Sequence, residues 1–399
     1  MATDYYSNPK NESNRKFKSN MFSLVCLVIS SLAVVILITL LATILVGGTS
    51  WLSWDFVSGV HKEDNPEGSG IGQAVIGSAL ICLICASVAI PIGIGTAIFL
   101  EEFQPRNKIL RWLHGLVQLN ISNLAGVPSI VYGILGLTTF VYLFNLIPSI
   151  QVNKPIPWEI GGTHYYQTKT LGRTFVKFPA GNRKENSIKL TQNEMCVDGE
   201  GNTFELKLVD KRSDAPKDPE LRKGFALRGR SASRLTERSP WYLHLPFGKS
   251  LLSAALTLAL VILPIVIISS QEAIRAVPRS IREAAYGMGA TRWQVVRKTV
   301  LPAATPGIMT GAILSMSRAI GEAAPVLAVM GGVLGTTTGI QSLMDQTPVL
   351  PVTIYRWAGD ENPGFENASS AAIIVLLLVL LIMNSVAILI RNRYEKKLA

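Results

Sequence analysis

Long apolar runs alternate with shorter polar connections along most of this chain. Six runs have the roughly 20 apolar residues that a membrane-spanning helix needs. They cover about 21–47, 71–100, 115–146, 249–270, 304–333 and 369–390. The first run is longer than the apolar core of a cleaved signal peptide, so we expect it to remain as a span. The pattern predicts an all-α polytopic membrane protein with six transmembrane helices.

The charges of the connections predict the orientation of these helices. Lys and Arg gather before the first run, between runs two and three, between runs four and five, and after run six. The segments 55–67 and 345–366, which alternate with them, are net acidic. Because basic connections stay in the cytoplasm, we expect a multi-pass protein of the cytoplasmic (inner) membrane. Both termini would be cytoplasmic, with tails at 1–20 and 392–399.

One connection is much longer than the others. Residues 147–248 separate spans 1–3 (21–146) from spans 4–6 (249–391), on the expected outer side. Within it, "TFELKLV" (203–209) alternates apolar and polar residues as a half-buried strand does, and 161–178 has a similar pattern. We expect a small β-rich extracytoplasmic insert in which the polar stretch 211–240 is mobile.

Composition excludes several classes of protein. The chain is 48% hydrophobic and only 16% charged, with a mean hydropathy of +0.33, which is too apolar for an ordinary soluble protein. The net charge of +11 fits basic cytoplasmic connections, so we expect contact with membrane lipid and none with nucleic acid. Cys82 and Cys85 lack further ligands nearby, and we expect no metal and no cofactor. There is no P-loop and no catalytic pairing, which predicts a non-enzymatic chain with ATP bound on another subunit.

Two charges interrupt the fifth apolar run. Arg318 and Glu322 are four residues apart, hence on one face of a helix, and Ser317 precedes them. On a continuous helix Arg318 would lie roughly 20 Å from either end. A charge at the bilayer centre costs about 2.5–3.5 kcal/mol on insertion scales. Two readings follow: a structural ion pair, or an Arg318 that attracts an anion while Glu322 keeps its binding weak. The planar guanidinium suits phosphate.

The basic connection 271–303 is too polar to span a membrane and is clearly patterned. "SIREAAYGM" has helix-forming composition, with Ser280 and Glu283 spaced as a capping box. Gly287 and Gly289 permit a sharp turn, and Thr291 can cap a second helix in "TRWQVVRK". The pattern predicts two short cytoplasmic helices joined by a glycine turn. They would contact either a partner protein or lipid headgroups.

This connection resembles the EAA loop of ABC-importer permeases. The matching residues are Glu283, Ala284, Ala285, Gly289, Leu301 and Pro302, while Thr299 stands where that family usually has Ile. The resemblance implies a MetI-like permease fold. It also implies that the loop docks into a groove of the nucleotide-binding subunit.

Further stretches resemble phosphate-importer permeases of the PstA type, notably "NLAGVPSIVYG" (123–133) and "SRAIGEAAP" (317–325). The resemblance covers about 300 residues, all but the N-terminal tail and the insert. It implies translocation of inorganic phosphate, coupled to ATP hydrolysis on a partner. The implied partners are a second, PstC-like permease, PstB-like ATP-binding subunits and a PstS-like extracytoplasmic phosphate-binding protein.

Candidate pathway residues combine both lines of reasoning. They are Arg318, Glu322, Ser317, Asn123, Ser129 and Tyr132. For the last three, close helix packing explains the residue types equally well. Two rival functions stay open: an importer for another oxyanion, and a membrane receptor whose insert binds a ligand. The EAA loop argues against the receptor.

Overall fold

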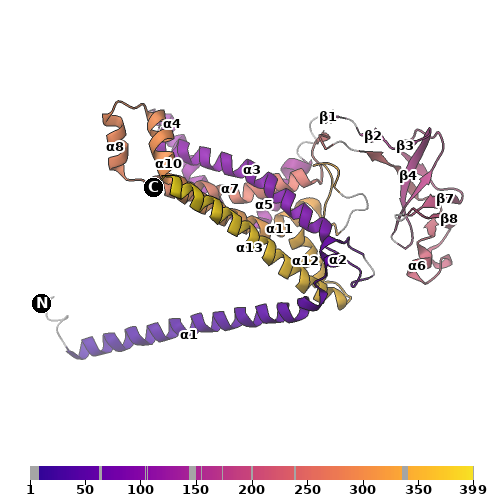
Figure 1. Ribbon diagram of the computed structural model, residues 1–399, viewed down its shortest axis with the longest axis horizontal. Helices are drawn as coiled ribbons and strands as arrows, with labels where there is room; N and C mark the ends of the chain where they lie inside the picture. The colour runs from indigo at the N-terminus through magenta and orange to yellow at the C-terminus, as the bar shows by residue number, and fades with distance from the viewer. Residues whose placement is uncertain are drawn as a thin grey trace.

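The structure, a computed structural model, describes residues 9–62, 65–103, 105, 107–142, 150–153, 155–172, 174–198, 201–237, 240–334 and 340–398. A helical bundle occupies one part of the molecule and a small strand region the other (Figure 1). The helices are α1 Pro9–Gly48, α2 Trp54–Ser58, α3 Gly72–Glu102, α4 Lys108–Leu124, α5 Ser129–Gly136, α6 Pro219–Arg222, α7 Leu251–Arg275, α8 Arg279–Gly287, α9 Arg292–Val295, α10 Leu301–Gly321, α11 Ala324–Met330, α12 Leu350–Ala358 and α13 Gly364–Leu398. Of the predicted tails, residues 1–8 and 399 lie outside the described residues.

Five of the described helical segments are long and apolar enough to cross a membrane. They are Lys16–Trp51, Gly72–Glu102, Leu251–Arg275, Arg292–Gly321 and Gly364–Arg393, and the bent pair α4–α5 makes a sixth if it counts as one span. The apolar runs 21–47, 71–100, 249–270 and 369–390 lie in helices α1, α3, α7 and α13. The other two runs differ from the expectation of continuous spans.

The third run is broken. Helix α4 ends at Leu124, and α5, continued by the π-helical turn Leu137–Tyr142, leaves at an angle of 113°. Pro128 explains the break, because proline lacks an N–H and its ring disfavours helical backbone at the preceding residue. The single span predicted over 115–146 is therefore wrong as a continuous helix, and residues 143–146 lie outside the described residues.

The fifth run is broken as well. Helix α10 ends at Gly321, Glu322 is extended with ψ 101°, and α11 starts two residues later with Pro325 in its first turn. A helix cannot run through Pro325 without losing a backbone hydrogen bond. The continuous helix predicted over 304–333 is therefore wrong. Arg318 lies in the last turn of α10, not at the centre of a long helix.

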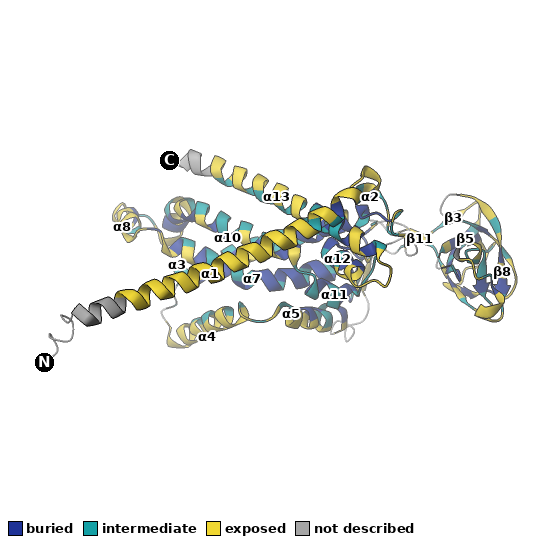
Figure 2. Ribbon diagram, turned by 90° about the horizontal axis from the view of Figure 1, so that it is seen from below, coloured by how far each residue is buried: buried dark blue, intermediate teal, exposed yellow. Residues whose placement is uncertain are grey.

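Helix α7 forms the centre of the bundle and packs closely on three neighbours. A Cβ at Gly93 of α3 would lie 2.6 Å from Val266, and a Cβ at Gly136 of α5 or Gly311 of α10 would overlap Thr257 or Ser269 of α7. Small residues let membrane helices approach in this way. Figure 2 shows α7 as mostly buried.

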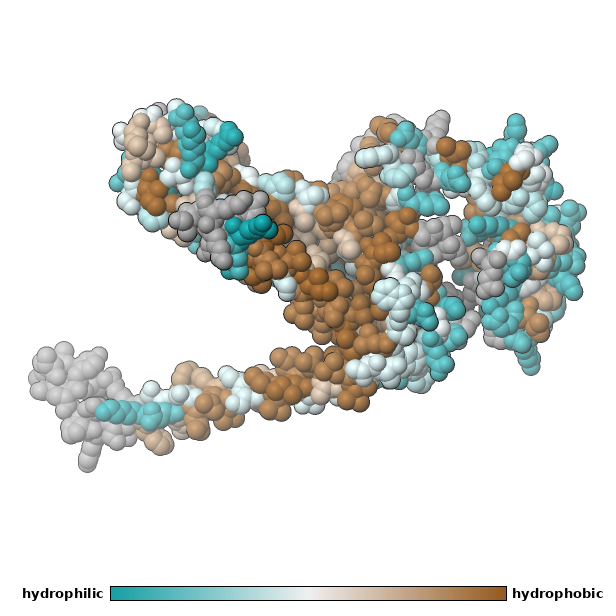
Figure 3. All heavy atoms as spheres, in the orientation of Figure 1, coloured by the Kyte–Doolittle hydropathy of each residue, from teal (hydrophilic) through white to brown (hydrophobic). Residues whose placement is uncertain are grey.

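Helix α1 has the opposite environment. Residues 16–43 are exposed along their whole length, and Figure 1 shows α1 diverging from the bundle as a separate rod. Its end alone packs tightly, where a Cβ at Gly48 would lie 2.7 Å from the Ala371 backbone nitrogen of α13. The exposed apolar surface of α1 and of the bundle forms the brown area of Figure 3.

Strands occupy the segment in which we expect the insert. They are β1 Ile150–Val152, β2 Ile156–Pro157, β3 Glu159–Ile160, β4 Thr163–Lys169, β5 Phe175–Pro179, β6 Ser187–Lys189, β7 Glu194–Val197, β8 Thr203–Val209, β9 Phe225–Leu227, β10 Ser231–Arg234, β11 Thr236–Glu237 and β12 Leu243–Leu245. The main sheet has the order β6-β10-β4-β5-β7-β8-β9, with β3 beside β4, and only β8–β9 is parallel among these pairs of the described strands.

The strand region has its own hydrophobic core. Tyr166, Val176, Phe178 and Leu206 are fully buried in a cluster separate from those of the bundle. Two antiparallel pairs, β1–β12 and β2–β11, connect it to the helices. The alternation at 203–209 predicts β8 correctly. The described part of 211–240 contains the short elements α6, β9, β10 and β11, and its mobility stays a prediction.

The molecule has two distinct ends. The start of α1, the helix α8 and the end of α13 lie at one end, and the main sheet lies at the other (Figures 1 and 2). The connection between α7 and α10 and the strand region are therefore separated by the length of the bundle.

Candidate translocation and coupling sites

The charged pair of the fifth run is an ion pair in the structure. Arg318 Nε lies 3.0 Å from Glu322 Oε1. The Glu322 side chain is 17% exposed, whereas Arg318 keeps 53% of its side-chain surface open. The carboxylate is therefore largely covered by the protein, while one side of the guanidinium remains accessible to another group.

The pair lies where two interrupted helices meet. Helix α11, which follows Glu322, packs on α5, which follows the break after α4. A Cβ at Gly133 of α5 would lie 2.9 Å from Pro325 and from Ala328 of α11. Broken helices are tolerated at membrane depth only inside protein or beside a water-filled cavity, and transporters bind their substrates at such breaks.

Asn123, Ser129 and Tyr132 surround the α4–α5 break. Asn123 is exposed at the end of α4, and Ser129 is half-buried as the first residue of α5. Tyr132 is buried and its hydroxyl donates to the carbonyl oxygen of Leu124 at 2.8 Å. This bond ties the two halves of the bend together, so for Tyr132 the structure favours packing over pathway lining.

Ser317 points toward α13. Its hydroxyl lies 2.6 Å from Asn384 Oδ1 and 2.9 Å from the Ile313 carbonyl oxygen. Nearby, Arg391 donates to Thr310 Oγ1 at 3.1 Å. Sequence reasoning missed Asn384, although an amide in the apolar run "LLIMNSVAI" was an available signal. These contacts join α10 to α13.

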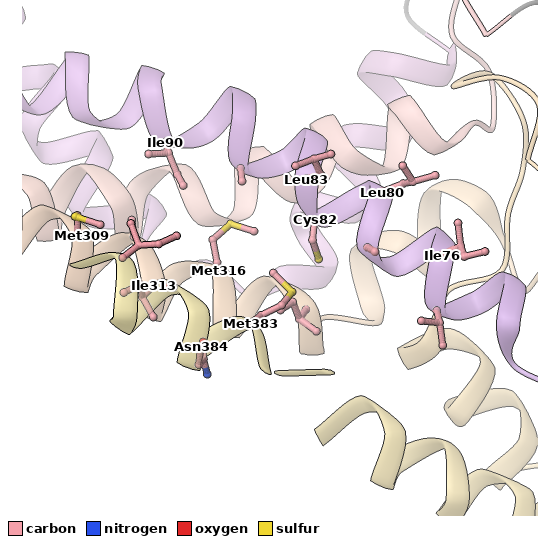
Figure 4. Close-up of a pocket in the computed structure, with 17 residues that line it drawn as sticks. Ile76, Leu80, Cys82, Leu83, Ile90, Met309, Ile313, Met316, Met383 and Asn384 are labelled. Atoms are coloured by element: carbon pink, nitrogen blue, oxygen red, sulfur yellow. The ribbon is translucent and has the colours of Figure 1, made fainter. Parts of the chain in front are cut away.

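Beside them lies an apolar groove of about 760 Å³ between α3, α10 and α13. Figure 4 shows Cys82, Ile90, Ile313, Met316 and Met383 pointing into it. Asn384 is the polar residue of the lining. An anion without hydrogen bonds in such surroundings is strongly disfavoured, so this groove is not the substrate site.

The connection between α7 and α10 has the predicted architecture of two short helices and a turn. Gly289 has φ +81°, a backbone conformation that glycine adopts without strain. Thr291 Oγ1 accepts from the Gln294 N–H, which makes Thr291 the predicted N-cap of α9. Helix α8 projects from the bundle in Figure 1.

One detail of the predicted loop is wrong. Helix α8 begins at Arg279 after Pro278, without a side-chain cap, so Ser280 and Glu283 form no capping box. Pro278 occupies the N-cap position, so Ser280 is the second residue of the helix and not its cap. A Ser at that position no longer faces the orphan N–H groups.

The two sides of α8 differ. Ala285 is buried, whereas Glu283, Ala284 and Gly289 are exposed, and Leu301 and Pro302 at the start of α10 are half-buried. Four large side chains on the outer surface of the loop, which sequence reasoning did not single out, are also exposed: Ile281 41%, Tyr286 44%, Met288 83% and Trp293 54%. Several large apolar side chains exposed on one projecting loop are typical of an interaction site.

Several proteins of known name are similar to this chain. "Phosphate transport system permease protein PstA 1" of Mycobacterium tuberculosis is 35% identical over 38% of this chain and 50% of its own. "Phosphate transport system permease protein PstC" of Haemophilus influenzae is 24% identical over 80% of this chain and 76% of its own. The inward-facing MetNI methionine ABC transporter covers 81% of this chain and 95% of its own, with 13% identity and a TM-score of 0.44.

The extent of these matches differs between relatives. The chain spans between 30% and 62% of the length of three of the curated relatives that it matches. The profile of one family, by contrast, matches residues 89–399, which include both broken helices and the whole of the α8–α9 connection. The chain belongs to the family described as "Binding-protein-dependent transport system inner membrane component".

Proposed function

We propose that this chain is a permease subunit of an ABC importer that translocates inorganic phosphate across the cytoplasmic membrane. The observation that carries the proposal is the Arg318–Glu322 pair, with its half-exposed guanidinium at the junction of two broken helices. Curated relatives named as phosphate permeases support the choice of substrate. The chain itself is non-catalytic, and a partner hydrolyses ATP.

The chemistry of the pair suits a phosphate that must bind and leave. Arg318 stays charged at any physiological pH and offers several N–H donors to phosphate oxygens. Glu322 partly neutralises it, which keeps the anion from being trapped, as transport requires. An ionised Glu322 can also accept the O–H of HPO₄²⁻. Sulfate has no such proton, so the carboxylate disfavours it.

The exposed groups of this chain support the other subunits of the proposal. A guanidinium inside a membrane must face protein or water rather than lipid, which favours a pathway between this chain and a second, PstC-like permease. The exposed side of α8 and α9 is the proposed docking site for PstB-like ATP-binding subunits. It includes Glu283, Ala284 and Gly289, with Leu301 and Pro302 supporting it.

We propose the orientation as well, with α8 in the cytoplasm. Both chain termini then lie on the cytoplasmic side, and residues 147–248 form the extracytoplasmic insert. There it would meet a PstS-like phosphate-binding protein. Two roles stay open for the insert: docking of this protein or of another envelope component, or a lineage-specific addition that the basic transport cycle does not need.

The test is phosphate uptake by the complete complex in proteoliposomes. Arg318→Gln should abolish uptake while the subunits still co-purify, and Arg318→Lys should retain part of it because it keeps the charge. Glu322→Gln should retain some phosphate uptake and admit more sulfate. The comparison of phosphate with sulfate uses a complex that transports without the binding protein, because the binding protein would itself select the anion.

The outcomes separate the alternatives. Wild-type uptake by the Arg318→Gln complex would show that the pair is only a structural ion bridge. Preferential uptake of another oxyanion by the wild-type complex would replace phosphate as the substrate and leave the pathway in place.

A further inference from the structure

The described end of the bundle next to α8 contains a cluster of charges that the proposed pathway and docking surface do not use. Helix α3 ends with Glu101 and Glu102, which are 16% and 8% exposed. Carboxylates in the last turn of a helix are repelled by the negative end of its macrodipole. Two arginines from elsewhere in the chain compensate them.

Arg282 of α8 compensates Glu102. Its Nη2 lies 3.1 Å from Glu102 Oε1 and donates to the Ile274 carbonyl oxygen at 2.6 Å. Ile274 belongs to the last turn of α7. One guanidinium on α8 therefore holds the C-terminal ends of both α3 and α7, where a cation is favoured by both helix dipoles.

This contact is enclosed. Arg282 is 24% exposed, and Glu102 Oε1 and Arg282 Nε are buried without a hydrogen bond from the described residues. Removing one member of such a pair leaves an uncompensated buried charge. The buried residue of α8 is apolar: Ala285 belongs to the same hydrophobic cluster as Ala97, Leu100 and Ile274.

Arg275 compensates Glu101 in a different way. Its Nη2 lies 2.6 Å from Glu101 Oε1, and its Nη1 lies 3.1 Å from Glu272. This pair joins α7 to α3 at the same level of the bundle but does not involve α8. Arg275 therefore joins α3 and α7 to each other, whereas Arg282 joins them to α8.

We propose that Arg282 is a positioning residue that transmits movement of α8 to the spanning helices α3 and α7. The proposal rests on the proposed role of α8 as the ATPase docking site. Small apolar contacts such as that of Ala285 can slide, because they have no preferred direction. Arg282 instead holds α7 by a directional hydrogen bond and α3 by an ion pair, so both helices follow α8 when the ATPase subunits move it.

The experiment measures phosphate transported per ATP hydrolysed by the complete complex, with the phosphate-loaded binding protein, in proteoliposomes. Arg282→Gln should lower this ratio by roughly tenfold, in the range typical of coupling between distant sites. ATP hydrolysis should continue, because the exposed docking side of α8 is unaltered. Arg282→Lys should restore part of the ratio, and Glu102→Gln should lower it in the same direction.

Arg275→Gln is the matched control. It removes an ion pair to the adjacent carboxylate of α3 and should leave the ratio close to that of the wild type. An unchanged ratio in Arg282→Gln, or an equal loss in Arg275→Gln, would overturn the proposal. If Arg282→Gln fails to assemble, Glu102→Gln, which keeps the α8 side chain, decides by the same ratio. A wild-type complex that transports no phosphate would instead count against the proposed function.

Discussion

The bundle and the strand region differ in how their residues are packed. In the bundle, α7 is enclosed by α3, α5, α10 and α11, and glycines at several crossings leave no room for a side chain. In the strand region, residues such as Tyr166, Phe178 and Leu206 form one core, and no described residue of that core belongs to a helix. The helices are therefore mutually dependent, whereas the sheet has the organisation of an independent unit.

This difference bears on function. Motion at one end of the bundle can reach the other end through shared contacts, as a transporter needs. The strand region is held by two short antiparallel strand pairs, which fits the proposed role of a docking platform. The following predictions test this contrast, starting with the largest expected effect.

Blocking the turn after α8 should abolish transport. Gly289 has φ +81° and its N–H donates to the Tyr286 carbonyl oxygen at 2.9 Å. Gly289→Pro cannot adopt this φ and removes the donor, while Glu283→Lys reverses a charge on the exposed side of α8. We expect normal membrane insertion of both variants, with loss of phosphate uptake in proteoliposomes.

Gly289→Asn is the control for this prediction, since Asn adopts positive φ more readily than most residues. It should retain most of the transport. Normal uptake by the combined Glu283→Lys and Gly289→Pro chain would show that α8 does not couple the ATPase to the bundle.

A side chain at the α7–α10 crossing should destabilise the whole bundle. Gly311→Leu would overlap the Ser269 side chain, and overpacking of this kind costs about 1–3 kcal/mol. We expect a lower midpoint of thermal unfolding in detergent. Gly95→Leu on α3 is the control, because a Cβ there meets nothing within 4 Å. Equal midpoints for the two variants would contradict the close packing around α7.

How far the sequence alone predicts this molecule depends on where the partner of each residue lies. Helices α7 and α13 and strand β8 follow from local apolar patterns, and the Gly289 turn and Thr291 cap follow from local chemistry. The helix breaks before Pro128 and Pro325 were not predicted. The interpretation relied on the continuous apolar composition of the two runs and gave too little weight to these prolines.

The contacts of Arg282 with Glu102 and of Ser317 with Asn384 join positions far apart in the chain. No local pattern contains that information. The same holds for the exposure of Arg318, which depends on how α5, α10 and α11 meet. The sequence thus indicates which residues are unusual, and the fold determines what they touch.

Removing the strand region should change the bundle little. Ile150 of β1 and Leu245 of β12 are paired neighbours, so their Cα atoms are separated by about 5 Å, as across any antiparallel pair. A short Gly/Ser linker can therefore replace residues 150–245 without moving the flanking segments. Co-purification of the subunits should be retained, and a failure to assemble would show that the insert supports the bundle.

The smallest expected effect concerns a thiol inside the sheet. Burial, and secondarily the charge of Glu194, raises the pKa of Cys196 from 9.0 to about 12. The thiolate is the reactive form, so at pH 8 the folded sheet should react with iodoacetamide about a thousandfold more slowly than an ordinary thiol with pKa 9. The proton is held more tightly in the folded state. Its contribution to stability is therefore complete below pH 9 and is lost as the pH rises from 9 toward 12.

The neighbouring position provides the comparison for Cys196. Met195 lies on the opposite face of β7 and is 57% exposed. In a chain with the other cysteines replaced by Ser, Met195→Cys combined with Cys196→Ala should react rapidly at pH 8, whereas Cys196 alone should react only after denaturation. The protection of Cys196 should persist when Gly311→Leu destabilises the bundle, because the sheet does not use the bundle for its core. Loss of protection in that variant would mean that the two regions unfold together, and the independence of the strand region would then be wrong.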